Sequence, residues 1–191
     1  MTIPNGSSRL PITTSIATSD DMRELGRRLA AVLRAGDLVI VSGPLGAGKT
    51  TLTQGIADGL GVRGPVTSPT FVIARVHPPL RADAGLGGTL PSLVHADAYR
   101  LGSALELDDL DLEADLQTSV TVVEWGEGRA ESLSEERLEI VITPVPPSGA
   151  QGTEGAPDGD DNDAPRAVSI SGVGSRWQDI RLPPADVGNR L

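Results

Sequence analysis

The chain of 191 residues contains no cysteine and very few aromatic residues. The absence of cysteine excludes disulfide bonds, thiolate metal sites and a cysteine nucleophile. Because aromatic residues make up only 2% of the sequence, the core must be built from leucine, valine, isoleucine and alanine. The formal net charge of −10 argues against a basic surface that would bind nucleic acid by itself, but it permits an RNA pathway in which another subunit holds the RNA.

Long apolar runs are also missing. No run reaches the roughly 18 residues that a membrane-spanning helix needs, and the segment 1–9 has no apolar signal-peptide core. We therefore expect a cytoplasmic protein with no membrane partner. The length predicts one domain over residues 1–182 with a loose tail at 183–191.

Lysine is almost absent. The chain has 16 lysine and arginine residues together, and Lys49 is the one lysine among them. A general bias toward arginine explains most of this imbalance. It also makes Lys49 informative, because a compact ammonium on a flexible stem was kept at one position only.

Lys49 lies in a complete phosphate-binding loop, which runs Gly43-Pro44-Leu45-Gly46-Ala47-Gly48-Lys49-Thr50. The apolar run 38–41 predicts a buried strand before the loop, and 51–60 predicts the helix that follows it. In such loops backbone N–H groups surround the phosphates, the lysine binds the β- and γ-phosphates, and the Thr50 hydroxyl binds Mg²⁺. A glycine-rich turn without a ligand is the alternative. The residues expected to contact the nucleotide are Gly43, Leu45, Gly46, Ala47, Gly48, Lys49, Thr50 and Thr51.

The N-terminal part of the chain predicts a strand and a helix. Residues 12–16 alternate between apolar and polar, as in a strand. Asp21 and Glu24 have the spacing of a capping box, and apolar residues then repeat at helical spacing as far as Leu33. Gly36 is expected to end this helix.

Short apolar runs predict further strands at 93–97, 120–124, 138–142 and 167–171, with the last two paired as C-terminal antiparallel strands. The segment 71–76 is also β-like. A capping box of Ser103 and Glu106 predicts an acidic helix through 116. Residues 78–91 are expected to form a surface loop. The segment 144–164 has four glycines, four prolines and five acidic residues, which predicts a disordered insertion. The whole pattern is that of an α/β protein.

Two carboxylates end predicted strands, Asp97 and Glu124. At the carboxyl edge of an α/β sheet an acid can hold Mg²⁺ directly or through water, or orient the attacking water. The alternative for each is a solvated residue at a strand end. Thr70 lies in a rigid Ser-Pro-Thr turn, which is either a sensor of the γ-phosphate or an ordinary proline turn.

Two further side chains near these strand ends have competing interpretations. His95, two residues before Asp97, suggests a metal pair, but such a histidine is usually structural. Trp125 either stacks on a base or packs against the protein.

The absence of one motif indicates which nucleotide the protein binds. Without a second lysine the guanine-reading Asn-Lys-x-Asp element is impossible, which disfavours a small GTPase and favours ATP. A small-molecule kinase is one rival, but it usually needs an arginine-bearing lid, and the loop 77–91 has only Arg81. A nucleotide-sensing adaptor that never hydrolyses ATP shares the same pocket, so residue types leave that alternative open.

Taken together, the motifs resemble one family. They are Gly-x-Leu-Gly-Ala-Gly-Lys-Thr-Thr at 43–51, Ser-Pro-Thr-Phe at 68–71, His-x-Asp-x-Tyr-Arg-Leu at 95–101 and Glu-Trp-Gly-Glu at 124–127. Their order and spacing resemble TsaE (also called YjeE), the bacterial P-loop ATPase of tRNA threonylcarbamoyladenosine biosynthesis.

The resemblance implies a P-loop NTPase fold with a mostly parallel central sheet and few helices. It implies that Thr50 and Glu124 hold Mg²⁺, and that Lys49, Asp97 and Thr70 serve ATP hydrolysis, with Thr70 near the γ-phosphate. The implied partners are TsaD and TsaB, which modify adenosine 37 of tRNA. The tRNA would be reached only through that complex.

Overall fold

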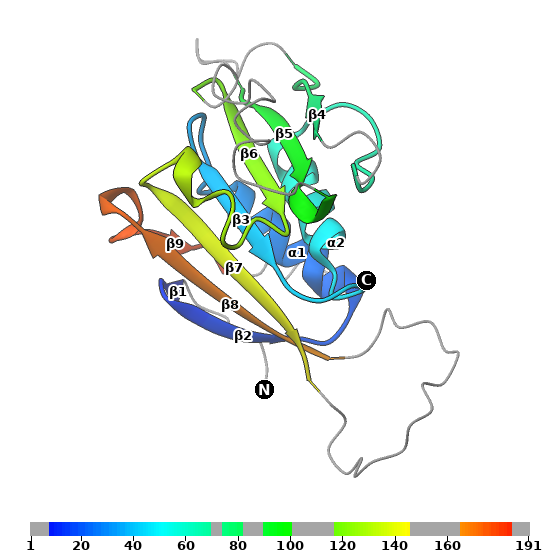
Figure 1. Cartoon of the computed structure of the whole chain (residues 1–191), viewed down its shortest axis with the longest axis vertical. Helices are drawn as coiled ribbons and strands as arrows, with labels where there is room; N and C mark the ends of the chain where they lie inside the picture. Colours follow the sequence, from blue (N-terminus) through cyan, green and yellow to red (C-terminus); the bar gives the residue numbers. More distant parts are fainter. Residues whose placement is uncertain (1–7, 70–73, 82–89, 101–116, 146–164, 185–191) are drawn as a thin grey trace.

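A seven-stranded sheet with two helices forms the frame of the protein (Figure 1). The computed structural model describes residues 8–69, 74–81, 90–100, 117–145 and 165–184. The main elements are β2 (Ile12–Ile16), α1 (Ser19–Ala30), β3 (Leu38–Ser42), α2 (Lys49–Leu60), β4 (Ala74–His77), β5 (Ser92–Asp97), β6 (Ser119–Glu124), β7 (Arg137–Pro144) and β8 (Arg166–Val173). Minor elements are the paired strands β1 (Ser8–Arg9) and β9 (Arg181–Leu182) and the 3₁₀ turns η1 (Ala98–Arg100), η2 (Glu131–Leu133) and η4 (Ser175–Trp177).

The sheet has the strand order β2-β8-β7-β3-β6-β5-β4. Its centre is parallel, because β3 pairs in parallel with both β6 and β7, and β5 pairs in parallel with β6. Strands β8 and β4 run opposite to these, and β2 pairs antiparallel with β8. The predicted mostly parallel sheet with antiparallel C-terminal strands is confirmed, including the pairing of 138–142 with 167–171.

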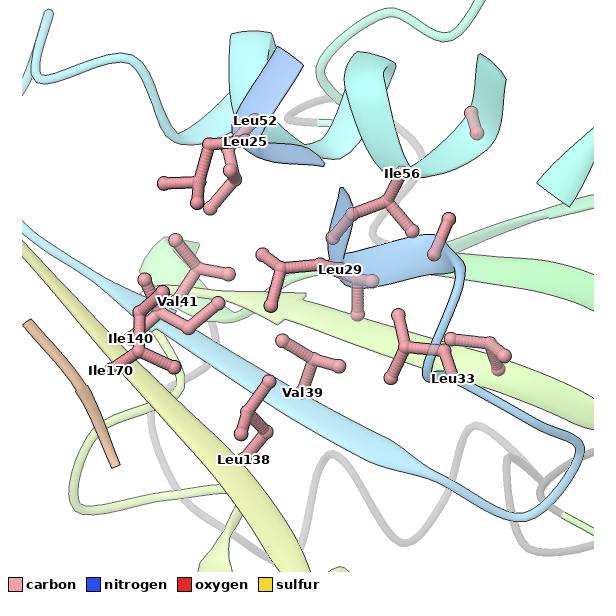
Figure 2. Packing of buried hydrophobic residues seen from close by; sticks show 14 of the residues in the cluster. Leu25, Leu29, Leu33, Val39, Val41, Leu52, Ile56, Leu138, Ile140 and Ile170 are labelled. Atoms are coloured by element: carbon pink, nitrogen blue, oxygen red, sulfur yellow. The ribbon is translucent and has the colours of Figure 1, made fainter. Parts of the chain in front are cut away.

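Both helices cover one face of the sheet. On β3, Val39 and Val41 join the cluster under α1 and α2, whereas Leu38 and Ile40 lie in a smaller cluster on the opposite face. Figure 2 shows leucine and isoleucine side chains of the helices above those of the strands. The continuous apolar run at 38–41 is therefore explained by a strand that is buried on both faces, with every second side chain facing the helices.

The two helices pack with their backbones in contact. A Cβ atom added at Gly26 would overlap the carbonyl oxygen of Leu52, and one at Gly55 would overlap that of Arg23. At Gly59 it would lie 2.5 Å from the Cβ of Ala30. Larger side chains at these glycines would push α2 away from α1.

The start of α1 differs from the sequence prediction. Thr18 caps the helix: its Oγ1 accepts a hydrogen bond from the Asp21 backbone N–H at 3.1 Å, and Asp21 Oδ2 accepts one from the Thr18 N–H at 3.2 Å. The predicted capping box of Asp21 and Glu24 is therefore wrong by one turn. Glu24 instead pairs with Arg27 on the helix surface at 2.9 Å. The helix also ends at Ala30, before Gly36, so Gly36 does not terminate it.

Several other predictions lie partly or wholly outside the described residues. Pro144 belongs to β7, so the predicted insertion at 144–164 begins too early. The rest of that segment, from 146 to 164, lies outside the described residues, as do 82–89, the predicted helix at 103–116 and the tail from 185. Among the residues that the structure describes, no helix has the length and apolar character needed to cross a membrane.

Candidate functional site

The loop between β3 and α2 is shaped by three glycines. Gly43, Gly46 and Gly48 have φ angles of 147°, 75° and 101°, which side chains rarely tolerate. At Gly43 there is also no room for a Cβ, because it would overlap the carbonyl oxygen of Ile142 on β7. Gly48 precedes the first residue of α2 and offers no side-chain cap. The first N–H groups of α2 are therefore suited to an anion.

Lys49 is folded back into this loop. Its side chain is buried, and its Nζ donates hydrogen bonds to the carbonyl oxygens of Gly43 and Pro44, each at 2.8 Å. Burial lowers the pKa of the Lys49 ammonium, and the nearby carboxylates of Glu124 and Asp97 oppose that shift. The ammonium is thus held by neutral carbonyl groups, whose place phosphate oxygens can take.

The pairing of β5 with β6 places two carboxylates side by side. Asp97 and Glu124 are register partners at the ends of these parallel strands. Alternation along the strands puts both on the face that α2 covers, because Leu93 and Val122 lie in the cluster under the helices. The two acids therefore lie at the same sheet edge, facing the start of α2.

Glu124 is held through both of its oxygens. Its Oε2 accepts a hydrogen bond from Thr50 Oγ1 at 3.1 Å, and its Oε1 is 2.7 Å from His95 Nε2. The carboxylate and the His95 ring are both buried. The structure thus brings Thr50 and Glu124 together, as a shared role in binding a metal requires.

Asp97 is buried beside them. Its Oδ1 accepts a hydrogen bond from the backbone N–H of Tyr99 at 2.9 Å, at the start of η1. It is also close enough to act electrostatically on Lys49. Thr70, the remaining predicted catalytic residue, lies outside the described residues.

Trp125 closes one side of the loop. Its φ is 60°, the one positive value among the non-glycine residues that the structure describes, and such a backbone costs about 1 kcal/mol or more. The Trp125 ring centroid lies 3.6 Å from Lys49 Nζ and 5.0 Å from the ring of Tyr99. The Trp125 side chain is half-buried and packs against the lysine of the phosphate-binding loop.

His95 is the residue that sequence reasoning undervalued. A lone histidine two positions from an aspartate is usually structural, but here it contacts the predicted metal ligand. Two facts together bring His95 to Glu124. His95 lies on the same strand face as Asp97, and Asp97 pairs with Glu124. The second fact is tertiary and is not contained in the spacing of a single motif.

The site and its frame define the class of the protein. A parallel strand, a glycine-rich loop and a helix lead to a sheet edge that carries carboxylates, which is the arrangement of the P-loop fold.

Comparison with known proteins gives the family. The family model "Threonylcarbamoyl adenosine biosynthesis protein TsaE" matches residues 16–148, and the chain belongs to the TsaE family. The Streptomyces coelicolor tRNA threonylcarbamoyladenosine biosynthesis protein TsaE is 57% identical over 157 residues, which is 82% of this chain and 93% of that protein. The Bacillus subtilis protein of the same name is 34% identical over 160 residues, covering 83% and 84%. The crystal structure of Bacillus subtilis YdiB matches with a TM-score of 0.60 at 29% identity, covering 90% of each chain.

Proposed function

We propose that this protein is a Mg²⁺-dependent ATPase that acts with homologues of TsaD and TsaB in the threonylcarbamoylation of adenosine 37 in tRNA. The observation that carries the ATPase part is the meeting of Lys49, Thr50 and Glu124 at the start of α2. The family relationship supports the pathway, since the relatives are named for this tRNA modification.

The donor set fits Mg²⁺. Thr50 and Glu124 offer hard oxygen atoms, which Mg²⁺ prefers, and their side chains are already 3.1 Å apart. The described residues contain no group of three or more carboxylate or histidine ligands. Mg²⁺ sites of nucleotide enzymes usually need no such group, because phosphates and waters complete the shell. When bound, Mg²⁺ would neutralise charge on the β- and γ-phosphates.

In this proposal each side chain of the site has a separate role in binding or hydrolysing ATP. The Lys49 ammonium exchanges its two carbonyl acceptors for phosphate oxygens, and the backbone N–H groups that follow Gly48 bind the same phosphates. The Thr50 hydroxyl donates its hydrogen to Glu124 and so keeps its lone pairs for the metal. Asp97, at the end of the neighbouring strand, is placed to accept a proton from the attacking water or to orient that water.

The charge of the chain supports a division of work with protein partners. The net charge of −10 is consistent with a subunit that leaves RNA binding to its partners.

The decisive experiment is phosphate release from MgATP, measured with the protein alone and with TsaD and TsaB homologues. We expect slow turnover alone and stimulation by the partners. Failure to bind MgATP at all would refute the proposal. Tight binding without hydrolysis in any mixture would favour a sensing adaptor, and transfer of the phosphoryl group to a metabolite would favour a kinase.

A further inference from the structure

Among the described residues, one nitrogen of the His95 ring has a hydrogen-bond partner and the other has none. The side chain is 0% exposed in the middle of β5, and Nε2 lies 2.7 Å from Glu124 Oε1. Because an ionised carboxylate only accepts hydrogen bonds, we assign the hydrogen to Nε2. The other ring nitrogen, Nδ1, has no hydrogen-bond partner among the described residues. Within the part of the chain that the structure describes, the single polar contact of the ring is therefore with the carboxylate predicted to bind the metal.

That contact fixes the orientation of Glu124. Glu124 is only 2% exposed, so water does little to hold its carboxylate. Thr50 binds one carboxylate oxygen and His95 binds the other, so rotation about the last side-chain bond would break both hydrogen bonds. If the His95 donor is removed, one buried oxygen loses its partner and the carboxylate is free to turn away from Thr50.

His77 shows what a buried histidine without this contact looks like. It lies on β4 and is 4% exposed. The antiparallel register pairs it with Leu93, two residues before His95, so both histidines lie on the same face of the sheet. Its Nδ1 lies 3.3 Å from the carbonyl oxygen of Arg63, in the segment after α2. Burial lowers the pKa of His77. The chain has only these two histidines, so each serves as the control for the other.

We propose that His95 is a positioning residue: its Nε2–H holds Glu124 in the orientation in which Glu124 and Thr50 together face the metal of a bound MgATP. This inference rests on the proposed function. It predicts that His95 affects the Mg²⁺-dependent part of nucleotide binding and leaves the metal-independent part unchanged.

Three substitutions of His95 retain its hydrogen bond to Glu124 to different degrees. His95→Gln keeps an N–H donor at about the reach of Nε2, His95→Asn keeps a donor that is too short, and His95→Leu has none. Binding of a non-hydrolysable ATP analogue is measured by calorimetry across a Mg²⁺ titration and again in EDTA. We expect the Asn and Leu variants to need about 10-fold more Mg²⁺, the range typical of outer-shell ligands. The Gln variant, and the matched control His77→Gln, should stay close to wild type.

A second measurement uses the unaltered protein, so it does not depend on how the variants fold. The ring nitrogen NMR spectrum contains two histidines only. We expect the His95 signals to show hydrogen on Nε2 and to shift when the analogue and Mg²⁺ are added together, but not with the analogue in EDTA. The His77 signals should stay in place.

The outcomes separate this inference from the proposed function. If wild type binds the analogue without any dependence on Mg²⁺, the proposed function fails and the role of His95 fails with it. If wild type depends on Mg²⁺ but His95→Leu has the same dependence, only the positioning role is refuted. Equal loss of binding with Mg²⁺ and in EDTA would show that His95 is merely structural, and so would His95 signals that ignore Mg²⁺.

Discussion

Two buried carboxylates at opposite ends of the sheet are held in different ways. Asp37, just before β3, accepts hydrogen bonds from Arg176 Nε at 3.1 Å and from its terminal nitrogen at 2.9 Å, a bidentate ion pair that is almost wholly buried. Arg176 also donates to the carbonyl oxygen of Val32. Glu124, at the other end, is bound by a histidine ring and a threonine hydroxyl, and among the described residues no arginine or lysine forms an ion pair with it.

The difference indicates which end is structural and which is functional. At the Asp37 end the protein supplies the compensating charge itself, so the end is complete without a ligand. At the Glu124 end the lysine is bonded to carbonyl oxygens and the acid to hydroxyl and ring donors. Glu124 and Asp97 act on Lys49 electrostatically, but among the described residues no ion pair joins Glu124 to that lysine. Under the proposed function, a cation would bind Glu124 and the phosphates would bind Lys49. The five changes below test this contrast.

The largest effect is expected at the structural end. Arg176→Leu leaves the buried Asp37 carboxylate without its cation, which typically costs about 3–5 kcal/mol of unfolding free energy. Urea unfolding measures this loss, and nucleotide affinity of the folded protein should be unchanged. The double variant Arg176→Leu with Asp37→Leu should recover much of the stability. A loss below about 1 kcal/mol for the single variant would contradict a structural role for the pair.

Lys49→Ala should affect binding instead of stability. Two hydrogen bonds to charged phosphates, at about 1.5 kcal/mol or more each, predict at least about 100-fold weaker ATP binding. The melting temperature should stay near that of wild type, because the lysine is bonded to loop carbonyls that water can satisfy. Lys49→Arg should fail as well, since the fork is too large for the loop. Wild-type turnover by the arginine variant would show that this account of the lysine is wrong.

Asp97→Asn tests the second carboxylate. If Asp97 acts on the attacking water, the variant binds MgATP nearly normally but hydrolyses it about 100-fold more slowly, even with partners present. Partner-stimulated phosphate release, measured beside binding of a fluorescent ATP analogue, separates the two properties. Loss of the Mg²⁺ dependence of binding in this variant would assign Asp97 to the metal.

Glu124→Gln should raise the Mg²⁺ concentration needed for ATP binding by between about 10- and 100-fold. The amide oxygen still accepts from Thr50, and the neutral His95 ring can carry its hydrogen on Nδ1 and accept from the amide N–H at Nε2. The stability should therefore change far less than in the Arg176 variant. A Mg²⁺ titration with the fluorescent analogue measures the first property and urea unfolding the second. If Glu124→Gln and Asp97→Asn lose binding equally, the two acids share the metal and their division of work fails.

The smallest effect is expected from removing residues 146–163. The ends of this segment are already held together, because the Val145 backbone N–H donates to the Pro165 carbonyl oxygen at 2.9 Å. A short Asn-Gly connection should therefore preserve the hairpin of β7 and β8. We expect the melting temperature to change by less than about 2 °C and ATP binding to stay the same. A drop of many degrees would show that the segment contributes to the core.

The parts of the fold that the sequence predicts well are those set by local patterns. The apolar runs before Asp97 and Glu124 gave strands in nearly the observed positions, as did the run before the phosphate-binding loop. The start of α1 was misplaced because Asp21 suits two positions: it resembles an N-cap, but it fills the third helical position of a box opened by Thr18. Local chemistry alone does not distinguish these two registers.

The parts that could not be predicted depend on residues distant in the sequence. The contact between His95 and Glu124 needs the register of β5 on β6, and the ion pair of Asp37 with Arg176 joins the start of β3 to η4. The cation–π contact between Lys49 and Trp125 requires both the loop conformation and a left-handed backbone at the tryptophan. The predicted site residues could be named from the motifs, but their hydrogen-bond partners could not.

The glycine contacts between α1 and α2 have a mechanical consequence. A slide of α2 by one turn toward its C-terminus would bring Thr51 to the place where Gly55 meets the backbone of Arg23, and there is no space for its side chain. A slide in the other direction would bring Gly59, another glycine, to the same place. The contact therefore opposes movement of α2 past α1 in one direction and leaves the opposite direction without this barrier.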